Sequence, residues 1–134
     1  MKIQTLILLA LLFASNAQAA DSIAGRYAGR VATGRDNETR SVDVTITQVG
    51  EHYELSGGAG YSTGRSAAPD FDGEANDITK PPYRFKFKDS FGNLGVATVT
   101  PTKSGIQFTV TITTTKDSRC LPLYELVELK MKNG

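Results

Sequence analysis

The sequence lacks a second cysteine. Cys120 stands alone among 134 residues, so no disulfide within the chain can hold the fold together and its core must do so. A lone cysteine can pair with another chain, but its more frequent fate is that of a small, buried apolar side chain. Histidine is equally scarce, because His52 is the only one. It lies on the outward row of an expected strand, where an ordinary solvated histidine is the expectation.

An excess of charge of either sign is missing as well. The sequence has 15 Lys and Arg against 14 Asp and Glu, a formal net charge of +1. Nothing therefore steers the protein as a whole towards nucleic acid. Beyond the N-terminus, no apolar run approaches the roughly 20 residues that a membrane-spanning helix needs. We therefore expect neither a nucleic-acid partner nor insertion into a membrane.

The N-terminus has the three parts of an export signal. Lys2 provides a positively charged start, residues 6–14 are apolar, and Ala17-Gln18-Ala19 places small residues where signal peptidase reads them. We expect a signal peptide over residues 1–19 and a periplasmic or secreted protein. Residues 20–134 are enough for one domain and too few for two.

Most of the remaining sequence alternates between apolar and polar residues with a period of two. In the clearest case, Tyr83, Phe85 and Phe87 alternate with basic residues. Similar runs cover residues 23–33, 41–49, 52–55, 94–100, 106–112 and 123–131. The Gly50-Glu51 step suits a tight hairpin, and no window has helical periodicity. These features predict an all-β fold: a single antiparallel eight-stranded barrel or sandwich. Its interior is expected to be filled by Tyr53, Tyr83, Phe85, Phe87 and Phe108.

Residues 56–82 break this pattern because they are rich in Gly, Pro and Ser. We expect a long loop with a short strand in its second half, where Phe71 and Ile78 occur. The first half is a candidate partner-binding loop, since tyrosine and arginine are common hot-spot residues on a backbone of small residues. Its candidate contact residues are Ser56, Tyr61, Ser62 and Arg65. A surface loop without a function is the alternative, and the sequence favours neither.

Two motifs that suggest catalysis or metal binding lack the neighbouring residues or elements that those functions require. Ser62 lies in a G-x-S-x-G pattern, but no helix follows it, and His52 precedes it where the hydrolase order requires a later histidine. The acidic loop from Asp70 to Asp77 gathers carboxylates around a glycine without the distal glutamate of the helical calcium loop, which leaves calcium binding open. We expect no enzyme and no cofactor, and the sequence identifies no metal ligands.

Two resemblances to known families bear on function. Residues 56–64, Ser-Gly-Gly-Ala-Gly-Tyr-Ser-Thr-Gly, resemble the inhibitory loop of the periplasmic lysozyme inhibitors, small eight-stranded β proteins that insert a Ser-Gly-x-x-Tyr-type loop into the lysozyme cleft. This resemblance implies that Ser56 and Tyr61 enter the cleft and that Arg65 faces the catalytic carboxylates. In addition, Gly25-Arg26-Tyr27 is similar to the start of the first strand in lipocalin-like barrels, which implies a ligand carrier.

The sequence therefore favours a non-enzymatic binding protein that presents residues 56–68 to a protein partner, with a lysozyme or another cell-wall hydrolase as the most specific candidate. One alternative is a lipocalin-like carrier of a small apolar ligand. The other is a structural subunit of the cell envelope that forms oligomers, in which Cys120 could link two chains. The oligomeric state and the identity of the partner stay open.

Overall fold

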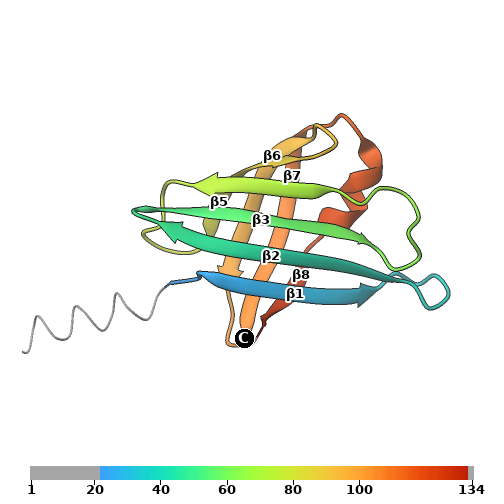
Figure 1. Ribbon diagram of the computed structural model, residues 1–134, viewed down its shortest axis with the longest axis horizontal. Helices are drawn as coiled ribbons and strands as arrows, with labels where there is room; N and C mark the ends of the chain where they lie inside the picture. The colour runs from blue at the N-terminus through green and yellow to red at the C-terminus, as the bar shows by residue number, and fades with distance from the viewer. Residues whose placement is uncertain (1–21, 133–134) are drawn as a thin grey trace, which may run out of the picture.

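The chain forms a closed antiparallel β-barrel in which every strand pairs with the next one along the sequence and β8 pairs with β1 (Figure 1). The computed structural model describes residues 22–132, so the expected signal peptide, 1–19, lies outside the described residues. The strands are β1 (Gly25–Ala32), β2 (Thr39–Val49), β3 (His52–Tyr61), β4 (Asp70–Ala75), β5 (Tyr83–Asp89), β6 (Leu94–Pro101), β7 (Gly105–Thr114) and β8 (Val127–Met131). The predicted all-β, eight-stranded fold is confirmed, as a barrel and not a sandwich.

The alternating sequence pattern decides which side chains face the barrel interior. Along β5, Tyr83, Phe85 and Phe87 are buried while the basic residues between them are exposed. The same alternation buries every second residue in the first halves of β2 and β3. Because side chains in a strand point to opposite faces in turn, one row fills the barrel and the other meets solvent.

Aromatic rings fill the barrel interior. All five aromatic residues expected there are buried, with exposed fractions of 3% or less. Phe71 lies at the centre of the cluster, with its ring centroid 5.2 Å from that of Phe87, 5.7 Å from that of Phe108 and 6.2 Å from that of Tyr124. A small eight-stranded barrel has just enough interior for its own side chains, and these rings occupy it.

The connection between β2 and β3 is the predicted two-residue hairpin. It consists of Gly50 and Glu51, and Gly50 has a φ of 60°. A positive φ at the first central residue of such a turn favours glycine over any residue with a Cβ. This hairpin and residues 76–82 lie at the left-hand end of the barrel in Figure 1, which we call the hairpin end.

The expectation of a long loop over residues 56–82 is wrong. Strand β3 continues to Tyr61, and its residues 56–61 pair with β2 along their whole length. Glycine is depleted in strands, so the composition indicated a loop. In this barrel, however, Gly57 lies so close to β2 that an added Cβ would overlap the carbonyl oxygen of Asp43. The predicted second strand is present as β4, and only residues 62–69 and 76–82 are irregular.

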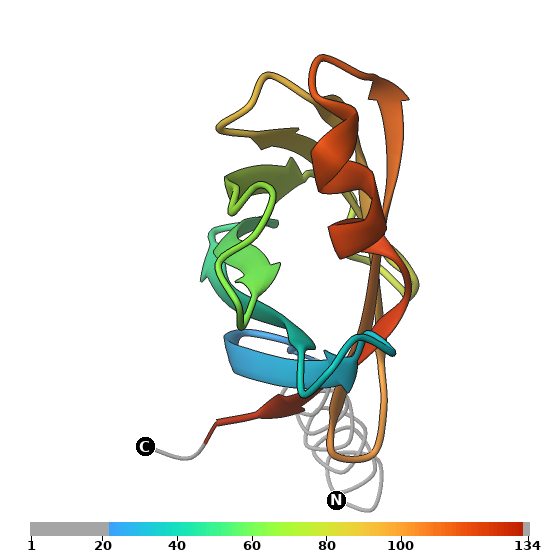
Figure 2. The same ribbon diagram turned by 90° about the vertical axis from the view of Figure 1, so that its right-hand side faces the viewer.

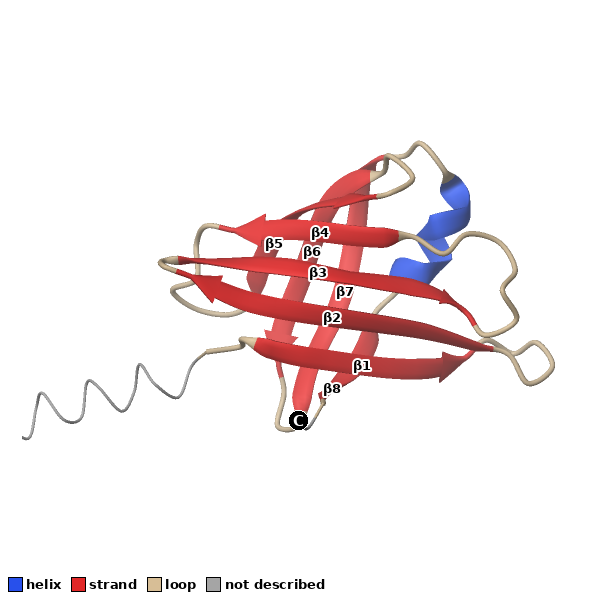
Figure 3. Ribbon diagram, viewed as in Figure 1, coloured by secondary structure: helices blue, strands red, loops and turns tan. Residues whose placement is uncertain are grey.

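The final expected strand, residues 123–131, is also only partly correct. Strand β8 begins at Val127, and a 3-10 helix, η1 (Ser118–Tyr124), precedes it (Figure 3). Asp117 caps η1 by accepting a hydrogen bond from the Arg119 backbone N–H at 3.1 Å. Such a short helix has no periodicity that a sequence could reveal. Nowhere in residues 22–132 is there a helix with the length and apolarity needed to cross a membrane.

Candidate functional site

Three irregular segments gather at the right-hand end of the barrel. Residues 33–38 connect β1 to β2, residues 62–69 connect β3 to β4, and residues 115–126 contain η1. Figure 2 looks onto this end and shows the three segments around the mouth of the barrel. We call it the loop end. Three of the four predicted contact residues, Tyr61, Ser62 and Arg65, lie here.

The fourth predicted contact residue, Ser56, does not lie with the others. Ser56 is exposed on the outer face of β3, opposite Asp72 of β4. Tyr61 is five residues further along the same strand, about 16 Å away, and it belongs to the inward row. Its ring is partly buried and packs against the core. Ser56 and Tyr61 therefore cannot enter one cleft together, which corrects the expectation that both belong to a single inserted loop.

A buried carboxylate organises the loop end. The Glu38 side chain is only 2% exposed, and Arg65 contacts both of its oxygens: Nε donates to Oε2 at 2.7 Å and Nη2 donates to Oε1 at 2.8 Å. The hydroxyl of Thr33 donates to Oε1 at 2.7 Å, and that of Thr63 donates to Oε2 at 2.5 Å. Each carboxylate oxygen thus receives two hydrogen bonds, which is how a buried charge is compensated.

These contacts set the charge of the loop end. The hydrogen bonds from Arg65 lower the pKa of Glu38 to about 2, against the opposing effect of burial, and the two threonine hydroxyls lower the pKa further. The guanidinium of Arg65 also lies 3.9 Å from the centre of the Tyr61 ring, in a cation–π contact. The guanidinium of Arg65 is therefore already paired with Glu38 and is not a free cation that could bind an acidic partner. It fixes the position of Tyr61 and of residues 62–65.

Ser62 continues the pairing between β2 and β3 instead of presenting a nucleophile. Its backbone N–H donates to the Thr39 carbonyl at 2.9 Å, and its Oγ accepts the Thr39 N–H at 2.9 Å. His52, the single histidine of the sequence, begins β3 and so lies at the other end of that strand. The geometry adds no support for catalysis at Ser62.

A second polar network, which the sequence analysis missed, holds η1 against the barrel. The Asp89 carboxylate accepts hydrogen bonds from the Tyr124 hydroxyl at 2.6 Å and from Asn93 Nδ2 at 2.8 Å. It also accepts the backbone N–H groups of Phe91 and Asn93 at 2.9 and 3.0 Å. Burial raises the pKa of Asp89, but these four bonds outweigh it, so the pKa lies below its ordinary value. The pKa of Tyr124 is raised, chiefly by burial and also by the hydrogen bond to Asp89.

Two further side chains attach the segment around η1. Asn93 Oδ1 accepts the backbone N–H groups of Lys116 and Asp117 at 2.7 and 2.9 Å. Arg40, which is 7% exposed, donates through Nη1 to the carbonyls of Leu123 and Glu125, both at 3.1 Å. Nothing in the sequence signals these contacts, because the partners of Arg40 lie 83 and 85 residues away.

This anchoring leaves two large apolar side chains in solvent at the loop end. Leu121 is 38% exposed and Leu126 is 61% exposed. Cys120, which precedes Leu121, is fully buried, and burial together with the charges of Asp89 and Asp117 raises its pKa to about 11. Its expected fate as a buried apolar residue is confirmed, and its thiol is not exposed for a link to a second chain.

The expected acidic loop from Asp70 to Asp77 is mostly strand. Asp70, Asp72 and Glu74 occupy the outward row of β4. Successive members of such a row are roughly 7 Å apart, so these carboxylates do not converge on one point as the ligands of a calcium loop do. The Asp77 carboxylate accepts hydrogen bonds from the backbone and hydroxyl of Thr79 at 3.2 and 2.8 Å.

Comparisons of the chain with protein-family models, with curated proteins and with solved structures found no match.

Proposed function

We propose that this protein is a non-enzymatic binding protein that recognises a protein partner through its loop end, residues 33–38, 61–69 and 115–126. The observation that carries the proposal is that hydrogen bonds to buried carboxylates hold the segments of this end together. Two buried carboxylates, Glu38 and Asp89, hold its segments in one arrangement while Leu121 and Leu126 stay exposed. An ordered surface with exposed apolar anchors is what a protein interface requires.

Segments that are already held in place favour binding for an energetic reason. Association usually costs free energy because loops and side chains lose conformational freedom. Here Arg65 already stacks on Tyr61, and Ser62 is already bonded to β2. The partner would therefore meet segments that hydrogen bonds within the protein already hold in place. This favours a binding role over the alternative of a surface loop without a function.

The resemblance of residues 56–64 to the loop of periplasmic lysozyme inhibitors makes a lysozyme-type hydrolase the first partner to test, for a protein that we expect to be periplasmic or secreted. The contact residues differ from those that the resemblance implies. Tyr61, Ser62 and Leu126 are the proposed contacts, Ser56 lies outside the surface, and Arg65 supports it from within.

The two alternatives receive less support. A carrier needs an open lumen, whereas aromatic rings occupy the interior of this barrel. An envelope subunit linked through Cys120 needs an accessible thiol, and that thiol is fully buried. Neither feature points to a different site, so the loop end remains the best candidate.

The proposal is tested by titrating the purified protein into animal and bacteriophage lysozymes and following lysis of cell walls. We expect stoichiometric inhibition that Tyr61→Ala and Leu126→Ser both weaken. Leu126 is 61% exposed, so its replacement should leave thermal stability nearly unchanged. Val49→Ser is the matched control, because Val49 is 42% exposed at the hairpin end. Inhibition that both loop-end variants retain would refute the proposed surface, and absence of inhibition would refute the lysozyme partner.

A further inference from the structure

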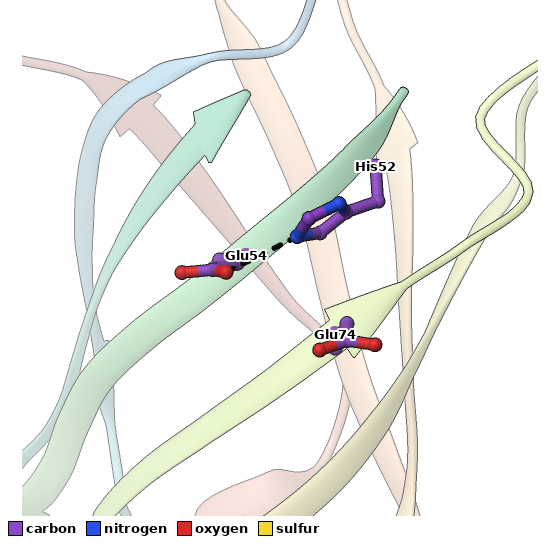
Figure 4. A group of neighbouring side chains, drawn as sticks. All are labelled: His52, Glu54 and Glu74. Atoms are coloured by element: carbon purple, nitrogen blue, oxygen red, sulfur yellow. Dashed lines mark hydrogen bonds and ion pairs between the residues drawn. The ribbon is translucent and has the colours of Figure 1, made fainter. Parts of the chain in front are cut away.

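Three potential metal ligands converge on the outer face of the barrel near the hairpin end. His52 and Glu54 are successive outward residues of β3, and Glu74 is the residue of β4 directly opposite Glu54. Figure 4 shows the imidazole of His52 turned towards Glu54, with the Glu74 carboxylate beside them. One ligand atom from each of the three residues lies within 4.8 Å of the other two. His52 Nε2 and Glu54 Oε2 are already only 3.1 Å apart.

The pairing of Glu54 with Glu74 is unfavourable without a cation. Like charges directly opposite each other on neighbouring strands destabilise a sheet. Lys86 occupies the position opposite Glu74 on β5, yet no ion pair joins them, whereas Lys88 lies 4.0 Å from Asp72. Among residues 22–132, no hydrogen bond or ion pair reaches the Glu74 carboxylate. The fold therefore places a carboxylate that has no hydrogen bond or ion pair within the described part of the chain beside the only imidazole of the sequence.

We propose that His52, Glu54 and Glu74 bind a divalent transition-metal ion, and we take Zn²⁺ as the ion to test first. The donor set supports this class of ion, because imidazole is a ligand of zinc and its neighbours, whereas calcium and magnesium take oxygen ligands. Zinc accepts both imidazole nitrogen and carboxylate oxygen as ligands, and three protein ligands leave a fourth position for water, as in open zinc sites.

The spacing of the donors fits such a site. With metal–ligand distances of about 2.0 to 2.2 Å, the ligand atoms of a tetrahedral zinc site lie about 3.3 Å apart. The His52–Glu54 separation of 3.1 Å already matches this value. Glu74 has to approach by at most roughly 1.5 Å, a movement that rotation of an exposed glutamate side chain can make. The strands hold the three backbone positions, so binding requires only side-chain adjustment.

The sequence alone does not reveal that these three ligands lie together. His52 and Glu54 are near each other in the sequence, but Glu74 joins them only through the register of β3 and β4. The site is independent of the proposed partner surface, because His52 begins β3 at the hairpin end and Tyr61 ends it at the loop end. Failure of either proposal leaves the other standing.

The test is isothermal titration of ZnCl₂ into the untagged protein without its expected signal peptide, residues 20–134. Because His52 is the only histidine, its ring signals in an NMR spectrum report on binding without ambiguity. We expect one site, movement of the His52 ring signals, and at least about tenfold weaker binding for His52→Ala and for Glu74→Gln. Asp72→Asn is the matched control, because Asp72 lies on the outward row of β4 next to Glu74, and it should bind zinc as the wild type does.

Three outcomes would overturn the assignment. The first is the absence of saturable zinc binding. The second is binding that His52→Ala or Glu74→Gln leaves unchanged, since the metal would then sit elsewhere. The third is Ca²⁺ binding as tight as Zn²⁺ binding, because an imidazole ligand should discriminate against calcium. All three substitutions replace exposed or half-exposed side chains, and circular dichroism confirms that each variant is folded.

Discussion

Arg65 binds both carboxylate oxygens of Glu38, and this joins the β3–β4 connection to the β1–β2 connection at the loop end. The two residues are 27 positions apart in the sequence. With the hydroxyls of Thr33 and Thr63, they form a closed polar unit around a side chain that is 2% exposed. The order of the loop end therefore depends on Glu38 remaining ionised.

This dependence predicts acid sensitivity. The pKa of Glu38 is lowered from 4.5 to about 2 in the folded protein, chiefly by the hydrogen bonds from Arg65. Its contribution to the free energy of unfolding is therefore complete above the unfolded pKa and is lost as the pH falls from about 4.5 to about 2. Asp89 and Asp117, whose pKa values are also lowered, add to the same trend. We expect the midpoint of thermal unfolding to fall steeply over this range.

Glu38→Gln isolates the contribution of the ion pair. A glutamine does not titrate, so the variant should unfold at a lower temperature than the wild type at about pH 7 and lose less stability on acidification. Thermal unfolding followed by circular dichroism at several pH values measures both effects. Parallel pH profiles for the two proteins would contradict the assignment of the ionised state to Glu38. Arg65→Ala should also destabilise the protein, because it leaves a buried carboxylate without its cation.

The hydrogen bond from Tyr124 to Asp89 should be worth more than an ordinary tyrosine hydrogen bond. Its acceptor is a buried carboxylate at 2.6 Å, whereas the hydroxyl of Tyr27 donates to the neutral carbonyl of Ile23 at 2.7 Å. We expect Tyr124→Phe to lower the free energy of unfolding by about 1.5 to 3 kcal/mol, and Tyr27→Phe by about 0.5 to 1.5 kcal/mol. Urea unfolding followed by circular dichroism gives both values. Equal losses would show that the charge of Asp89 does not strengthen its bond.

The thiol of Cys120 should be unreactive in the folded protein. Its side chain is fully buried, and its pKa is raised to about 11, mainly by burial, so little thiolate is present and reagents cannot reach it. We expect almost no reaction with a thiol-specific dye at about pH 8 under native conditions and one reactive thiol per chain in denaturant. Rapid stoichiometric labelling without denaturant would mean that η1 detaches readily, and it would revive the hypothesis of a link between chains.

The sequence predicted those features that depend on local pattern. The alternation of Tyr83, Phe85 and Phe87 identified the inward row of β5, and Gly50-Glu51 identified a hairpin turn. Both follow from residues that are neighbours in the sequence and respond to the same backbone geometry.

Features that depend on barrel closure were beyond prediction. The Glu38–Arg65 pair and the Asp89–Tyr124 bond join positions 27 and 35 residues apart, and their register follows from the whole set of strand pairings. The extent of β3 was missed for a related reason. Its glycines indicate a loop by composition, but the close approach of β2 to β3 requires one of them, a constraint that appears only once the barrel is formed.

The glycines of residues 57–60 allow this explanation to be tested. A Cβ at Gly57 would overlap the carbonyl oxygen of Asp43, a backbone atom held in the ladder between β2 and β3. A Cβ at Gly60 would meet only the Cβ of Ala68, at an ordinary contact distance of 3.6 Å. We expect Gly57→Ala to lower the free energy of unfolding by about 1 to 3 kcal/mol through overpacking. Gly60→Ala should change it little, or raise it by about 0.4 to 1 kcal/mol by restricting the unfolded chain.

Urea unfolding of the two variants distinguishes a strand from a loop over these residues. In a surface loop, both substitutions would restrict the unfolded chain and neither would meet a backbone atom, so their effects would be alike and small. In the barrel, only Gly57 is enclosed between Asp43 and Phe71. A large loss confined to Gly57→Ala would therefore place residues 56–61 in the sheet, with Ser56 on the outer face and Tyr61 at the loop end. Similar small effects would restore a single exposed loop and, with it, the possibility that Ser56 and Tyr61 contact one partner together.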